Sequence, residues 1–90
     1  MGGPSTAQWR RGQVGPSAAL GRAGEKARFA LARLREHPEG AEGRDGALKA
    51  AAEAVHAYFI QRELCGFRRH DAVIREYEIP RGVLVRLGAK

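Results

Sequence analysis

Three histidines and one cysteine are the side chains of this sequence best suited to catalysis or metal binding: His37, His56, His70 and Cys65. His56 and Cys65 are nine residues apart, which places them on opposite sides of a helix with about 3.6 residues per turn. A nucleophilic Cys–His pair is therefore disfavoured, and Cys65 is better explained as a small buried apolar residue. The set also lacks the ligand spacing of a zinc site. We expect no metal and no cofactor.

The acidic side chains do not form a catalytic pair either. Glu39 and Glu42 lie in a glycine-rich stretch, and Glu76 and Glu78 lie next to a predicted break in the chain. General acid–base catalysis usually needs a carboxyl group withdrawn from water, and neither location predicts one. We therefore expect a protein that is not an enzyme.

Arginine accounts for thirteen of the sixteen basic residues, and its planar guanidinium group suits recognition of phosphate. The apolar spacing in residues 70–87 matches a helix-turn-helix, a unit that reads DNA. On this hypothesis Arg81 and Arg86 would face a groove of the duplex, and Arg68 and Arg69 would contact phosphates. The alternative, which we favour, is that two short helices joined by a proline turn have a purely structural role.

The elements that must position these residues are helices, because apolar side chains recur at helical spacing. A first helix is predicted from about Ser17, its N-cap, to the residues before Pro38. Two glycines weaken its first turns, so its firm part is expected to begin near Glu25. Its apolar face consists of Leu20, Gly24, Ala27, Leu31 and Leu34. The small residues on this face would let a neighbouring helix approach closely.

A loop over residues 37–46 precedes a second predicted helix, which runs from about Ala47 to Cys65. Asp45 is expected to cap its start, and Gly66 to end it in the left-handed conformation. Its apolar band is wider than one partner helix would cover, which favours contact with a second copy of the chain. The predicted self-association face consists of Leu48, Ala52, Val55, Phe59, Ile60 and Leu64.

Two short helices are predicted in the last part of the chain. Asp71 is expected to cap the first, over residues 72–77, and Pro80 to begin the second, which ends at Gly88. The expected fold is all-α: residues 17–88 form one small domain, a long helical hairpin with two short helices folded against it. Its twenty larger apolar side chains can form a small core, which leaves too little for a catalytic cleft.

Residues 1–16 contain four glycines, two prolines and no apolar periodicity, so they are predicted to form a disordered arm. Within it, Trp9-Arg10-Arg11 would either anchor to an anionic surface or fold back onto the domain. No apolar run is long enough to span a membrane. The single cysteine and the lack of a secretory signal favour the cytoplasm. The net charge of +6 supports weak attraction to polyanions.

Residues 58–66 (YFIQRELCG), followed by residues 77–80 (YEIP), resemble a small bacterial family of unknown function. Residues 20–24 (LGRAG) are similar to another segment of that family. The resemblance implies a short, cytoplasmic, helical protein without an assigned activity, so no functional residues can be transferred from it. It draws attention to the polar residues 61–63. A buried interaction between Arg62 and Glu63, a contact with a partner and an exposed turn are the three alternatives there.

These observations predict a non-enzymatic helical interaction or structural module that self-associates as a homodimer. The first alternative is nucleic-acid binding through residues 70–87. The second is binding to an anionic membrane surface through the Trp9-Arg10-Arg11 segment. For the interaction module, we expect a second copy of the chain and a further protein as partners.

Overall fold

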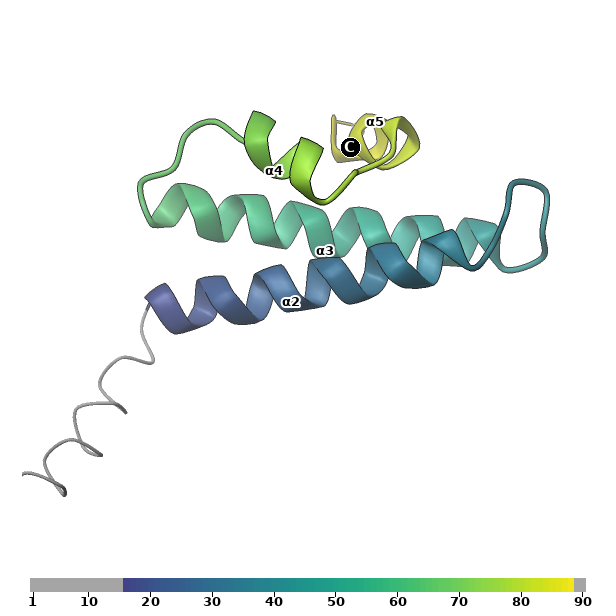
Figure 1. Cartoon of the computed structure of the whole chain (residues 1–90), viewed down its shortest axis with the longest axis horizontal. Helices are drawn as coiled ribbons and strands as arrows, with labels where there is room; N and C mark the ends of the chain where they lie inside the picture. The colour runs from purple at the N-terminus through teal and green to yellow at the C-terminus, as the bar shows by residue number, and fades with distance from the viewer. Residues whose placement is uncertain (1–15, 89–90) are drawn as a thin grey trace, which may run out of the picture.

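The computed structural model describes residues 16–88, and within this range there are four helices and no strand. They are α2 (Pro16–Arg35), α3 (Arg44–Leu64), α4 (Asp71–Glu76) and α5 (Arg81–Gly88). Helices α2 and α3 run antiparallel as a long hairpin, and α4 and α5 form a second layer across α3 (Figure 1). The predicted all-α fold, with a hairpin and two short helices, is confirmed.

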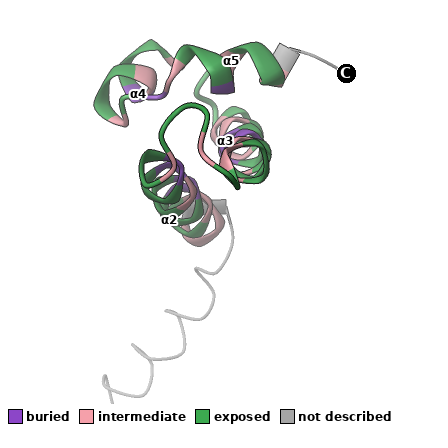
Figure 2. Ribbon diagram, turned by 90° about the vertical axis from the view of Figure 1, so that its right-hand side faces the viewer, coloured by how far each residue is buried: buried purple, intermediate pink, exposed green. Residues whose placement is uncertain are grey.

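The core lies where α2, α3 and the second layer meet (Figure 2). The predicted face of α2 is confirmed, since Ala27, Leu31 and Leu34 are almost completely buried. The other helices contribute small or branched side chains to the same core. The buried residues outside α2 are Ala51, Ala52, Val55, Tyr58, Val73, Ile79 and Val83.

Helix α3 packs against two partners within the chain, α2 on one side and α5 on the other. Val83 of α5 is completely buried, and Leu48 of α3 packs against the same core. This arrangement explains the wide apolar band of α3. The sequence analysis attributed that band to a second copy of the chain, but the chain's own α5 covers a large part of it.

The first helix begins earlier than predicted. It is continuous from Pro16, although the weak propensity of its glycines predicted a firm start only near Glu25. The reason is tertiary packing, because Gly24 is buried against the side chains of Tyr58 in α3 and Tyr77 at the end of α4. Contacts of this kind outweigh the intrinsic preference of a single residue.

The three predicted N-caps, Ser17, Asp45 and Asp71, are wrong, because each lies inside a helix that begins earlier than predicted. Gly43 occupies the N-cap position of α3 in the left-handed conformation, with φ of 89°, and Asp45 lies within the first turn. His70 occupies the N-cap position of α4, so Asp71 is its first helical residue. Gly43 has no side chain to cap α3, and the His70 side chain makes no capping hydrogen bond. The two aspartates still lie at the positive end of the helix dipole.

The predicted end of α3 is confirmed. Gly66 has φ of 99°, and its N–H donates to the carbonyl oxygen of Glu63 while the N–H of Phe67 donates to that of Arg62. This pair of bonds is the usual left-handed ending of a helix. Between α4 and α5, Glu78 takes the corresponding positive φ of 52°, which is uncommon for a residue with a side chain.

The predicted arm over residues 1–16, including Trp9-Arg10-Arg11, lies outside the described residues except for Pro16. No helix within residues 16–88 combines the length and the apolar character needed to cross a membrane.

Candidate interaction surfaces

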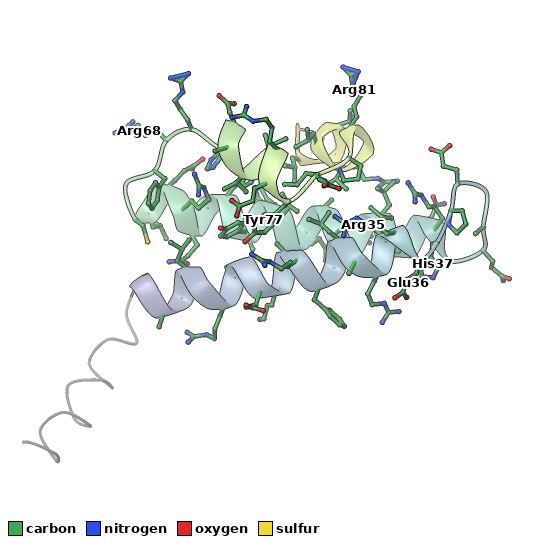
Figure 3. All side chains as sticks on the ribbon, viewed as in Figure 1. Arg35, Glu36, His37, Arg68, Tyr77 and Arg81 are labelled. Atoms are coloured by element: carbon green, nitrogen blue, oxygen red, sulfur yellow. The ribbon has the colours of Figure 1, made fainter. Side chains whose placement is uncertain are left out.

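Of the arginines predicted to contact nucleic acid, two lie in the connection between α3 and α4 (Arg68 and Arg69) and two lie in α5 (Arg81 and Arg86). Arg68, Arg69, Arg81 and Arg86 are all exposed, and Figure 3 shows Arg68 and Arg81 pointing away from the hairpin. Arg69 lies 4.0 Å from the carboxylate of Asp71, and both side chains are largely in water, so this ion pair contributes little. The four cations are therefore available to a ligand, which is what the hypothesis required of them.

The layer formed by α4 and α5 is attached to α2 through Tyr77. The Tyr77 hydroxyl donates to the hydroxyl of Tyr58 at 3.4 Å, and the two rings stack with centroids 5.5 Å apart. Arg28 lies over the Tyr77 ring, 4.8 Å from its centroid, and donates to its hydroxyl at 3.3 Å. Arg35 donates to the backbone carbonyl of Tyr77 at 3.0 Å (Figure 3). Two arginines of α2 thus fix the turn that joins α4 to α5.

This cluster shifts the titration of two of its members. Burial, reinforced by the hydrogen bond with Tyr77, raises the pKa of the Tyr58 hydroxyl above its usual value of 10.0. The hydrogen bond to the Tyr77 hydroxyl raises the pKa of Arg28, which stays charged in any case. Both groups keep their ordinary charge at neutral pH, so the cluster is suited to holding the helices together.

The polar residues that the family resemblance pointed out form a second attachment. The Arg62 side chain donates from Nε to Nδ1 of His70 at 3.0 Å and from Nη2 to the carbonyl oxygen of Arg69 at 2.8 Å. Nε2 of His70 lies 3.1 Å from a carboxylate oxygen of Glu63. His70 also stacks on Phe59, with centroids 4.1 Å apart. Arg62 and Glu63 therefore interact through His70, within the chain, and together hold the segment that leads into α4.

The histidines and the cysteine are dispersed. His37 lies at the end of α2, where its Nδ1 bonds the carbonyl oxygen of Arg33 at 2.9 Å. Arg44 donates to the carbonyl oxygen of His37 at 2.6 Å and closes the same helix end. His56 is exposed on α3, and Cys65 is half-buried at its C-cap. Residues 16–88 contain no group of three or more metal-ligating side chains.

The predicted self-association face is largely covered by the chain itself. Ala52 and Val55 are buried, and Leu48 and Phe59 pack against the core. Ala52 and Val55 are therefore not accessible to a second copy of the chain, and the half-buried Leu48 and Phe59 are accessible only in part. Ile60 and Leu64 remain, with 43% and 71% of their surfaces exposed.

A groove that the sequence analysis missed runs between α2 and α3. Its larger hollow, of about 510 Å³, lies between Phe29, Ala30 and Arg33 of α2 and Gly46, Ala47 and Ala50 of α3. A smaller hollow of about 180 Å³ continues it, between Ala19, Arg22 and Lys26 of α2 and Ala54 and Ala57 of α3. We call the two hollows together the α2–α3 groove.

Two sequence signals could have revealed this groove. Phe29 lies outside the apolar face of the first helix and is 66% exposed, so an aromatic residue out of register was the first signal. The second was the spacing of Ala47, Ala50, Ala54 and Ala57, which places them along one side of α3. The same alanines also have strong helix propensity, which by itself does not indicate a groove.

A helical hairpin crossed by two short helices defines this protein as a small all-α domain. Residues 13–90 match the model of a family of unknown function, DUF6665, and the chain belongs to this family. The resemblance seen in the sequence to a family of unknown function is thereby confirmed. No curated protein and no protein of solved structure matches the chain.

Proposed function

We propose that this chain is a non-enzymatic helical interaction module that binds a protein partner through the α2–α3 groove. The α2–α3 groove is the observation that supports this proposal. Alanine and glycine line a hollow of about 510 Å³ beside Phe29, a large aromatic side chain that is 66% exposed. An exposed aromatic residue next to an unfilled apolar hollow is typical of surfaces that become buried on binding.

The uses of the histidines support the non-enzymatic part of this proposal. His37 bonds the end of α2, and His70 is held between Arg62 and Glu63. Both imidazoles are engaged with the chain's own backbone or side chains, in arrangements that stabilise helix ends and connections.

Self-association belongs to the same proposal, through a smaller surface than the one predicted. Ile60 and Leu64 are four residues apart and therefore adjacent on one side of α3. Both are exposed, and a second copy would bury them. A patch of this size supports weak, concentration-dependent association.

Nucleic-acid binding through residues 70–87 is the second candidate, because the four predicted arginines are exposed, two in the connection before α4 and two in α5. On this candidate, affinity for duplex DNA falls steeply with salt, with a slope near −0.9 per phosphate contacted. Arg81→Ala would weaken a preferred sequence by roughly 1–3 kcal/mol, while Arg69→Ala would weaken all sequences alike. Binding that ignores sequence and responds equally to removal of any surface cation would eliminate it.

Co-purification from the native host tests the interaction module. Ala50→Glu puts a charged side chain into the larger hollow, and Ala32→Glu puts the same side chain on an exposed part of α2 outside the groove. We expect at least one protein to co-purify with the parent chain and with Ala32→Glu, and to be lost with Ala50→Glu. The same set of proteins with all three chains would contradict the proposal.

A further inference from the structure

We infer that the α2–α3 groove binds an acidic amphipathic helix of the partner protein. This inference rests on the proposed function and specifies the chemistry of its partner.

The charge of the groove has one sign. Arg22, Lys26 and Arg33 are the charged residues that line its two hollows, and neither hollow has an aspartate or glutamate in its lining. The side chains of Arg22, Lys26 and Arg33 are exposed and make no hydrogen bond or ion pair with another residue between 16 and 88. A partner with carboxylates along its edge would neutralise this row of unpaired cations.

The shape of the groove fits a helix. Its floor consists of alanine and glycine, which permit a close approach of the partner backbone. From Ala19 to Arg33 the groove follows α2 for about 21 Å, or about four helical turns. Phe29 stands at its edge and would pack against the apolar face of the incoming helix. Grooves of this type bind amphipathic helices through apolar side chains repeated every three or four residues.

Three other occupants fit the groove less well. A second copy that docks through its own α2 would bring the same cations against Arg22, Lys26 and Arg33, and like charges repel. Residues 1–15 contain Arg10 and Arg11 and no acidic residue, so this segment has the wrong charge as well. A flat anionic membrane would meet the cations, but it would leave the floor of a concave groove empty.

The inference is tested with designed peptides of about eighteen residues. The probe has leucines on one helical face and glutamates on either side of them. One control has the same leucines flanked by lysines, and another has the composition of the probe in an order without an apolar face. In fluorescence anisotropy at physiological ionic strength, we expect the acidic amphipathic peptide to bind at least about tenfold more tightly than either control.

Variants of the chain locate the binding. Ala50→Glu is expected to weaken binding of the acidic peptide at least about tenfold, whereas Ala32→Glu leaves it nearly unchanged. Replacing Arg22, Lys26 and Arg33 together by glutamine is expected to weaken it by about tenfold and to flatten its salt dependence. Circular dichroism confirms that each variant keeps its helical content.

Three results would each overturn the inference. The first is that the control peptide without an apolar face binds as tightly as the acidic amphipathic peptide. The others are equal effects of Ala50→Glu and Ala32→Glu on peptide binding, or binding of the chain to phosphatidylglycerol vesicles without binding to the acidic peptide. Failure of the inference is distinguishable from failure of the proposed function. A host protein lost with Ala50→Glu, combined with no binding of the acidic peptide, would reject the acidic helix and retain the interaction module.

Discussion

Gly24 sets how closely α2 approaches the stacked pair formed by Tyr58 of α3 and Tyr77 at the end of α4. A Cβ atom at this position would lie 3.2 Å from Cε1 of Tyr58 and 3.2 Å from the hydroxyl oxygen of Tyr77. Tyr58 is buried and bonded to Tyr77, so neither ring can withdraw without disturbing the stack. Gly21, one turn earlier on the same helix, has no atom within 4 Å of such a Cβ.

The two glycines give a matched prediction for stability. Gly21→Ala is expected to raise the free energy of unfolding by about 1 kcal/mol, because alanine is the better helix former. Gly24→Ala is expected to lower it by about 1 kcal/mol, since overpacking outweighs the same propensity gain. Urea denaturation of the two variants measures both values. Equal stabilisation by both substitutions would show that α2 does not press on the tyrosines.

Tyr58 predicts how stability responds to alkaline pH. Its pKa is raised in the folded protein, first by burial and then by the hydrogen bond with Tyr77. Above pH 10 the unfolded chain therefore ionises this residue more readily than the folded chain does. The contribution of protonated Tyr58 to the free energy of unfolding is therefore fully present below pH 10, and it is lost as the pH rises through the pKa of Tyr58 in the folded protein.

We expect the unfolding free energy of the parent chain to fall more steeply between pH 9 and pH 11 than that of Tyr58→Phe. Urea titrations at several pH values, with the ionic strength held constant, measure the two slopes. Parallel slopes for the two proteins would mean that Tyr58 titrates alike in the folded and unfolded states.

Among the elements, α4 depends most on side chains outside itself. It has six residues, which is too short for independent stability. Arg62 holds the segment before it by bonding both His70 and the carbonyl oxygen of Arg69. Val73 of α4 and Ile79 after it are buried in the core and provide the apolar contacts of this segment. The guanidinium group makes two bonds in different directions, which a lysine cannot reproduce.

Arg62→Lys is therefore expected to loosen α4 while leaving the hairpin intact. Hydrogen exchange of the α4 amides should become about tenfold faster, the effect of losing one charged hydrogen bond, and exchange within α2 should change little. Arg68→Lys, at an exposed position in the same connection, is the matched control. Equal acceleration by both substitutions would show that the Arg62 bonds do not hold the segment.

The helices themselves were largely predictable because their signals are local. The spacing of Leu31 and Leu34 gave the buried face of α2, and Gly66 marked the end of α3. The N-caps were mispredicted because Asp45 and Asp71 suit two neighbouring positions at a helix start almost equally. The groove depends on how α2 and α3 cross, and no residue pattern within one helix specifies that crossing. The sequence likewise does not specify that the chain's own helices cover Val55, because this depends on how the helices are arranged in three dimensions.

On the scale of the whole molecule, exposed cations of residues 16–88 lie on two separate surfaces. Cations of α2 line the groove, and the arginines around α4 and α5 lie on the other layer. Ile60 and Leu64 form a third, apolar surface near the end of α3. The proposal assigns protein binding to the first surface and self-association to the third.

Self-association through Ile60 and Leu64 is checked by mass. Sedimentation velocity between about 1 and 100 µM is expected to show a mass that rises reversibly with concentration, as mass action requires. Leu64→Glu should shift the chain to monomer. Val85→Glu, which alters another exposed apolar residue on α5, should leave the association unchanged. A monomer at every concentration would remove self-association from the proposal.

The most direct test of the interaction module is photo-crosslinking in the cells of the native host. A photoreactive phenylalanine analogue replaces Ala50 in the larger hollow of the groove, or Ala32 on the exposed side of α2 as the control. The account predicts a protein adduct of defined mass from position 50 on illumination, and none from position 32. Adducts from neither position, or the same adducts in equal yield from both, would contradict the assignment of the groove as the binding surface.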